Sequence, residues 1–159
     1  MDLYLVARLL HIFGSTVLFG TGIGIAFFMF RAHFTRDPKI IAATAETVVT
    51  ADFVFTATAV VLQPLTGYWL MRLTGLDFSE GWIILALALY VLTGLCWLPV
   101  VAIQMRLRDL ARAADHAGQP LDNRYDRMFW LWFALGWPAF SSVIGIFWLM
   151  VAKPDITWL

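Results

Sequence analysis

The chain carries little charge for its length. Only 14% of its 159 residues are Asp, Glu, Lys or Arg, and the formal net charge is zero. A soluble domain has about a quarter charged residues, and a domain that binds nucleic acid has a marked basic excess. The composition therefore argues against a soluble domain and against nucleic acid as a partner.

Cysteine, linkers and repeats are also scarce. Cys96 is the single cysteine, so an intrachain disulfide is excluded and the redox compartment cannot be inferred from cysteine content. The start, MDLYLVARLLHIF, lacks a basic n-region and a small-residue cleavage site, which favours a retained first helix over a signal peptide. With no internal repeat and no long polar linker, residues 1–159 are predicted to form one domain.

Apolar residues are abundant instead. They make up 61% of the chain, and mean hydropathy is +0.78. A chain of this size cannot hide so much apolar surface in a core. Four apolar stretches approach or exceed the roughly 20 residues that a membrane-spanning helix needs: 3–30, a stretch within 40–73, one that begins at 82, and 128–151. We expect an all-α, four-helix transmembrane bundle.

Two of these helices are longer than the membrane is thick. The sequences PKIIAATAETVVTAD and IQMRLRDLARAADHAG extend the second and third helices, and Gly118 is a plausible C-terminal stop. We expect the extensions to stack on each other outside the bilayer. Eight Lys and Arg residues lie in 31–40 and 105–127, whereas only Arg72 and Lys153 lie at the opposite end. The positive-inside rule then places both termini on the periplasmic side of a bacterial inner membrane, with the extensions in the cytoplasm.

Polar side chains of the spans fall at one depth. Counting 1.5 Å per residue from the outer helix ends puts His11 roughly 12 Å into the membrane. Several other polar residues reach a similar level, namely Arg8, Gln63, Tyr90, Ser141 and Ser142. Such groups usually face the bundle interior, where they join helices by hydrogen bonds or perform a function. For the serines and Tyr90 the first reading is favoured. For His11 both stay open, because neutral imidazole is a metal and heme ligand and Arg8 can meet an anionic group.

Other residues of note are expected to be structural. Gly20 and Gly24 have the small-xxx-small spacing of close helix packing, and prolines inside the spans (Pro64, Pro99 and Pro138) are expected to free backbone carbonyls. Glu46 and Asp52 are expected to form interfacial ion pairs, with a proton path as the alternative. His33 and His116 are expected at the surface.

Several stretches resemble a known family: LLHIFGSTVLFGTGIGIAFFMFRAH, ADFVFTATAVVLQPLTGYWLM, ALYVLTGLCWLPVVAIQMRLRDLA and FALGWPAFSSVIGIFWLMVAKP. Nearly end to end, the chain resembles the bacterial integral membrane proteins of domain of unknown function family 2269. More distantly it is similar to protoporphyrinogen oxidases of the HemJ type and to CopD-type copper proteins. In those oxidases, heme b is bound and a histidine of the first helix acts with a lysine of the third. LLHIFG places His11 at that histidine, but GWIILALALY has no such lysine.

The resemblance implies one function, and the residues leave others open. The first hypothesis is a membrane redox protein that binds heme b, with His11 as the metal ligand and Arg8 beside a propionate. Gln63, water or a residue of a partner subunit would fill the sixth position, and Tyr90 is a further candidate cofactor-binding residue. The second is a non-catalytic membrane subunit or a small transport protein without a cofactor. A third is a copper-handling protein, although the chain lacks the Met and His ligands that copper favours. Besides lipid, the partners left open are a second copy of the chain and a membrane redox partner.

Overall fold

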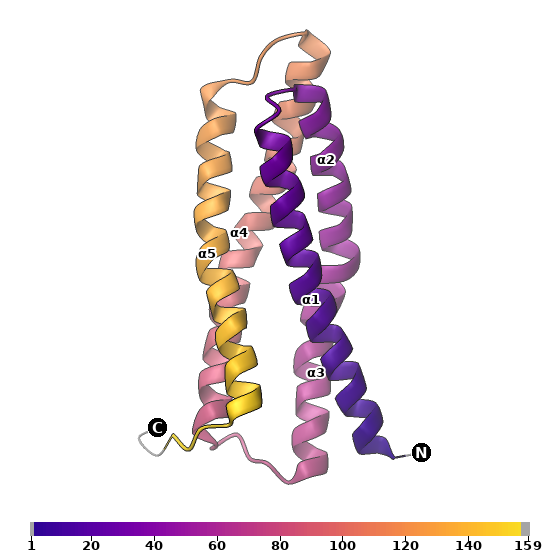
Figure 1. The fold of residues 1–159 in the computed structure, drawn as a ribbon, viewed down its shortest axis with the longest axis vertical. Helices are drawn as coiled ribbons and strands as arrows, with labels where there is room; N and C mark the ends of the chain where they lie inside the picture. Colours follow the sequence, from indigo (N-terminus) through magenta and orange to yellow (C-terminus); the bar gives the residue numbers. More distant parts are fainter. Residues whose placement is uncertain (1, 157–159) are drawn as a thin grey trace.

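The computed structural model describes residues 2–156, and within them every regular element is helical (Figure 1). The first span is α1 (Leu3–His33). The second is one composite helix made of α2 (Pro38–Ala51), the π-helix η1 (Asp52–Thr56) and α3 (Ala57–Thr74). The third and fourth spans are α4 (Gly81–Ala117) and α5 (Asn123–Ala152). The predicted four-helix transmembrane bundle is confirmed.

Local chemistry sets where the helices begin and end. The carboxylate of Asp37 accepts hydrogen bonds from the first backbone N–H groups of α2, and Pro38 supplies a fixed φ at its first position. Asp2 and Asp122 cap α1 and α5 in the same way. Gly118, with φ of 61°, ends α4 in the left-handed region, as the sequence predicted.

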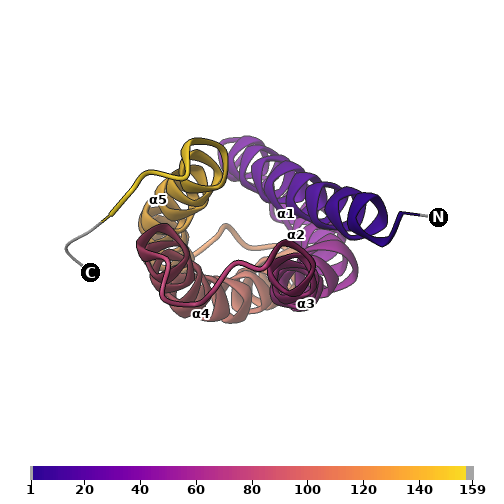
Figure 2. The same ribbon diagram turned by 90° about the horizontal axis from the view of Figure 1, so that it is seen from below.

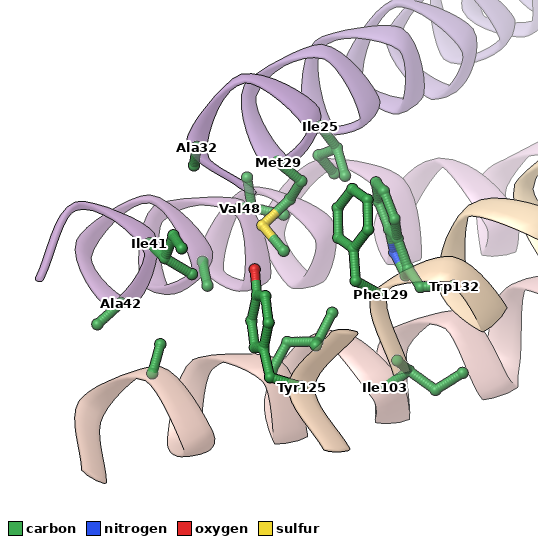
Figure 3. Close-up of a cluster of buried hydrophobic side chains, with 13 residues drawn as sticks. Ile25, Met29, Ala32, Ile41, Ala42, Val48, Ile103, Tyr125, Phe129 and Trp132 are labelled. Atoms are coloured by element: carbon green, nitrogen blue, oxygen red, sulfur yellow. The ribbon is translucent and has the colours of Figure 1, made fainter. Parts of the chain in front are cut away.

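The main core lies at the end of the bundle that carries residues 31–40 and 105–127, called here the basic end. All four spans contribute to it, as Figure 3 shows. Fully buried residues of the second span and α4, such as Ile41, Ala45, Leu107 and Ala111, pack together beneath Phe129 of α5. The helical extensions therefore stack as predicted, and α1 and α5 cover them.

The opposite end, called the terminal end because both chain termini lie there, is more open. Here α1 packs along α3 and α4 packs along α5, and α1 leans away from α5 (Figures 1 and 2). A small cluster around Trp82 and Leu149 joins α4 to α5. Large apolar side chains such as Phe13 and Leu95 are each 65% exposed. Exposure of this extent is expected when the surrounding solvent is lipid.

The close helix contacts use glycines other than the predicted pair. A Cβ on Gly20 would meet nothing within 4 Å, and one on Gly24 would meet only Phe28 of the same helix. Gly14 instead lies against the Gln63 side chain, and a Cβ on Gly67 would come within 3.4 Å of the His11 ring. The α1–α3 approach thus depends on Gly14 and Gly67. The spacing rule missed it because small residues permit contact without specifying which face makes it.

Candidate functional site

His11 lies at the contact between α1 and α3, and its ring is oriented by hydrogen bonds. Its Nδ1 is 2.8 Å from Oγ1 of Thr66. The Thr66 hydroxyl also lies 2.8 Å from the carbonyl oxygen of Leu62, to which it donates. With the hydroxyl hydrogen on that carbonyl, Thr66 accepts from His11, which assigns the ring proton to Nδ1 and the lone pair to Nε2; with the hydrogen toward Nδ1, the assignment is reversed.

Gln63 fixes the helices around this ring. Its amide Nε2 donates to the backbone carbonyl of His11 at 3.0 Å. The His11 site, defined as His11, Gln63, Thr66 and Gly67, is therefore built entirely from α1 and α3. Two groups of the site keep a coordinating atom without a hydrogen-bond partner among residues 2–156: the half-buried imidazole of His11 and the amide oxygen of Gln63.

The other residues predicted at this depth lie elsewhere or are otherwise engaged. Arg8 is exposed, with its guanidinium carbon 6.0 Å from the centre of the Tyr4 ring. Ser141 is exposed, and Ser142 donates to the Pro138 carbonyl of its own helix at 2.7 Å. The structure thus brings His11 and Gln63 together and leaves Arg8 and the serines apart from them.

Tyr90 has a structural partner that explains its position. Its hydroxyl donates to the backbone carbonyl of Val60. In an α-helix that carbonyl would accept from the residue four positions later, which is Pro64 and has no N–H. Tyr90 of α4 therefore satisfies the acceptor that the proline frees, as expected for a proline inside a span.

A second polar centre lies in the bundle closer to the basic end. Asp52, the first residue of the π-helix, is only 3% exposed. Its Oδ1 accepts from the indole N–H of Trp97 at 3.2 Å. With the Gln104 amide oriented to satisfy its neighbours, its Nε2 donates to Asp52 Oδ2 at 3.0 Å and its Oε1 accepts from the Trp132 indole at 3.2 Å. This Asp52 site links the second span, α4 and α5.

Thr56 completes the Asp52 site from the other end of the π-helix. Its hydroxyl is buried, and among residues 2–156 it has no partner within hydrogen-bonding distance, although it is near enough to stabilise the carboxylate. Thr50 and Thr58, on either side, donate to carbonyls four residues earlier. The π-turn, closed by the Ala57 N–H on the Asp52 carbonyl, changes this local geometry. Such π-segments often accompany functional sites.

The sequence only partly anticipated this second centre. Glu46 does form the expected ion pair, with Arg112 of α4. Asp52, in contrast, is buried and has neutral partners, and Gln104 carried no signal of its own. An apolar helical context around a single Asp was the available clue, because an ionisable residue within a span is costly and usually has a purpose.

His33 also differs from its expected surface position. It is 4% exposed, and its ring is stacked on Phe129 with 3.6 Å between ring centres. His116 is exposed, as expected. No group of three or more His, Cys, Asp or Glu side chains placed to hold a metal occurs among residues 2–156.

Four apolar helices around a shared core define the chain, over its described part, as a four-span integral membrane protein. The family model Predicted integral membrane protein (DUF2269) matches residues 5–154, and the chain belongs to that family. No curated protein and no solved structure matches the chain. The family description specifies no activity, so any activity has to be argued from the sites.

Proposed function

We propose that the chain is a small membrane redox protein that holds heme b through Nε2 of His11. The observation that carries the proposal is the hydrogen bond between His11 and Thr66. Histidines that bind metals usually donate their other ring N–H to an oxygen, which fixes the tautomer and the ring orientation. His11 has this arrangement when its proton is on Nδ1. A histidine that only joined α1 to α3 would not need to keep the lone pair of its second ring nitrogen free.

The residues of the chain fit one axial position of a heme. His11 supplies the ligand atom, and Arg8 has no ion-pair partner among the described residues, so it is available to a propionate one turn outward. Tyr90 and Gln63 each donate to a backbone carbonyl, and Gln63 does so through Nε2, which leaves its amide oxygen unpartnered among the described residues. A second axial ligand would come from this oxygen, from water or from another subunit.

Bound heme would supply one-electron redox chemistry, and the surrounding residues have definite tasks. Thr66 keeps the proton on Nδ1 of His11, which leaves Nε2 basic. Gln63 holds the backbone of His11 against α3, and Gly67 leaves room beside the ring. Oxidation of a porphyrinogen is not proposed, since the GWIILALALY stretch has no lysine.

The test is an absorption spectrum of the protein purified in detergent after expression with ample heme. We expect Soret and alpha bands in the reduced-minus-oxidised spectrum, and loss of both in His11→Ala. His116→Ala is the matched control, because this histidine is exposed in the last turn of α4. Absence of the bands from the wild-type protein would rule the proposal out.

A second candidate is a membrane subunit or transport protein without a cofactor. This candidate is favoured by three hydrogen bonds between helices. Gln63 and Thr66 join α3 to α1, and Tyr90 joins α4 to α3. Hydrogen bonds of this kind contribute about 0.6 kcal/mol each in membranes. On this account His11→Ala lowers thermal stability slightly and leaves the absorption spectrum and the cellular phenotype unchanged.

A further inference from the structure

The Asp52 carboxylate is surrounded by neutral groups only. Its hydrogen-bond partners are the Trp97 indole and the Gln104 amide, and the buried, unpartnered Thr56 hydroxyl lies one turn along. Two charged pairs at the basic end hold each other, Glu46 with Arg112 and Arg36 with Asp126. Among residues 2–156, no Lys, Arg or His nitrogen from any helix lies within 4 Å of the Asp52 carboxylate. A buried carboxylate without a cation loses hydration and gains no salt bridge in return.

Two neighbours of Asp52, the Gln104 amide and the Thr56 hydroxyl, can face either an ionised or a protonated carboxyl group. The Trp97 N–H is a fixed donor and favours an ionised carboxylate. The Gln104 amide can turn to present its oxygen, and the Thr56 hydroxyl can donate or accept. A shell that only had to hold a permanent anion would need donors alone. We infer from this geometry that Asp52 is a proton-binding site whose occupancy sets the orientation of the Gln104 amide.

The exchange is simple to write. A hydronium ion gives up a proton to Asp52 Oδ2: one O–H bond of hydronium breaks, a new O–H bond forms at the carboxylate, a water molecule is left, and no electron is transferred. The new O–H donates to the Gln104 oxygen once the amide has turned. The amide nitrogen then faces the Trp132 indole, where two donors meet, so the Trp132 N–H loses its acceptor. Proton uptake on the second span thereby breaks a hydrogen bond between α4 and α5.

The position in the bundle suits a proton more than a metal ion. Ca²⁺ and Mg²⁺ require several oxygen ligands, whereas two N–H groups point at this carboxylate when the Gln104 amide is satisfied. Asp52 lies 22 residues before the end of α3 at Thr74, which is roughly 33 Å along a helix and comparable to the thickness of the hydrocarbon core. The carboxylate is therefore buried in protein near the basic-end boundary of the membrane, where water is close.

The π-helix gives a reason for the placement. A π-turn inserts one residue and rotates the helix that follows it. As a result, α2 packs on α4 with one face, and α3 packs on α1 with another face, which carries the partners of His11. Asp52 lies at this junction with its side chain toward α4. The proposal does not depend on a cofactor at His11, and either can fail without the other.

The test follows two signals of the full-length protein in detergent as pH is varied. The first is the infrared carbonyl stretch of a protonated carboxylic acid. The second is the indole ¹H–¹⁵N resonance of Trp132, assigned by its disappearance in Trp132→Phe. The other Asp and Glu residues contribute to the infrared band in both proteins, so the Asp52 signal is the wild-type minus Asp52→Asn difference. We expect this difference to titrate with the same midpoint as the Trp132 resonance, and the Trp132 change to be lost in Asp52→Asn. Gln104→Leu should retain the infrared change and abolish the Trp132 change.

Control variants and ions separate the alternatives. Asp77→Asn, in the exposed loop before α4, should alter neither titration. An infrared change at the Trp132 midpoint that Asp52→Asn does not remove, or a Trp132 titration that persists in that variant, would overturn the assignment. A shift of the Trp132 resonance on exchanging K⁺ for Na⁺ at constant pH would identify a metal cation as the ligand instead. If Asp52→Asn does not fold, the Trp132 titration of the wild-type protein and its loss in Gln104→Leu still decide the matter.

Discussion

Gln104 of α4 stands between Asp52 and Trp132, with one end of its amide 3.0 Å from the carboxylate and the other 3.2 Å from the indole nitrogen. The amide thus joins three spans by two hydrogen bonds in a site from which solvent is excluded. Its side chain is 1% exposed. Loss of one partner in such a place leaves buried polar groups unsatisfied, which costs more than the bond itself contributes.

Gln104→Leu should therefore destabilise the bundle strongly. The change leaves Asp52 Oδ2 and the Trp132 N–H without partners, at about 1–3 kcal/mol for each group. Thermal unfolding in detergent measures the effect. Gln119→Leu, at an exposed position beyond α4, is the control and should leave the unfolding temperature unchanged. Equal stability of the two variants would contradict the network.

Gly14→Ala should separate α1 from α3, because the new Cβ would overlap the Gln63 amide. The Gln63 side chain must then move and lose its hydrogen bond to the His11 carbonyl. We expect a loss of about 1–3 kcal/mol in the free energy of unfolding. Gly20→Ala provides the comparison on the same helix, because its Cβ would meet nothing within 4 Å; it should be neutral or slightly stabilising, since alanine favours helices by about 1 kcal/mol over glycine.

The residues in these two comparisons show which parts of the structure could be predicted from the sequence. The spans followed from hydrophobic length, and the stop at Gly118 from its known preference for the left-handed region, because both depend on local chemistry. The level shared by His11 and Gln63 followed from the constant rise of a helix. Which face each helix turns to its neighbours did not follow. Rotation about the helix axis depends on packing between distant segments, so Arg8 was grouped with His11 and Gly20 was preferred to Gly14.

The Asp52 site shows a second limit. The sequence predicted an interfacial ion pair for Asp52, whereas the structure buries its carboxylate among neutral partners. The π-turn that begins at Asp52 shifts the helical repeat by one residue. A pattern analysis that assumes 3.6 residues per turn does not include this shift, and it therefore did not predict that Asp52 contacts Trp97 and Gln104.

Thr66→Val should release the tautomer of His11. The substitution keeps the shape of the side chain and removes the oxygen that lies 2.8 Å from Nδ1. Nitrogen-15 spectra of histidine-labelled protein distinguish the two neutral tautomers. We expect the wild-type ring to carry its proton on Nδ1 and the valine variant to show a mixture, while Thr66→Ser retains the wild-type form. A wild-type ring with its proton on Nε2 would remove the main support for ligation through that atom.

Arg36 combines a strained backbone with an ion pair, and substitutions can separate the two. Its φ of 56° is unfavourable for a residue with a Cβ, and its guanidinium makes two hydrogen bonds to the Asp126 carboxylate, at 2.5 and 3.0 Å. The Asp126 carboxylate raises the pKa of this guanidinium above its usual value. Arg36→Ala loses the pair and keeps the strain, so it should lower stability by about 0.2–1 kcal/mol.

Arg36→Gly loses the same ion pair and removes the strain, which costs roughly 1–2 kcal/mol for a residue with a Cβ. It should therefore be at least as stable as the wild-type protein in thermal unfolding. The deficit of Arg36→Ala should shrink as salt is added, because the side chains are 49% and 32% exposed and such pairs are screened. A glycine variant less stable than the alanine variant would mean that the backbone strain is not significant.

The orientation of the bundle in the membrane is testable with the single cysteine. Cys96 is buried in α4, and Cys96→Ala gives a background without thiols. On it, Gln119→Cys places a thiol in the loop at the basic end, and Phe78→Cys places one in the short loop between α3 and α4, both exposed. Because the excess of Lys and Arg remains in the cytoplasm, a membrane-impermeant maleimide applied to spheroplasts should label the thiol at position 78 and not the one at 119. Permeabilised cells should show labelling at both positions, and the reverse pattern in intact spheroplasts would place the termini in the cytoplasm.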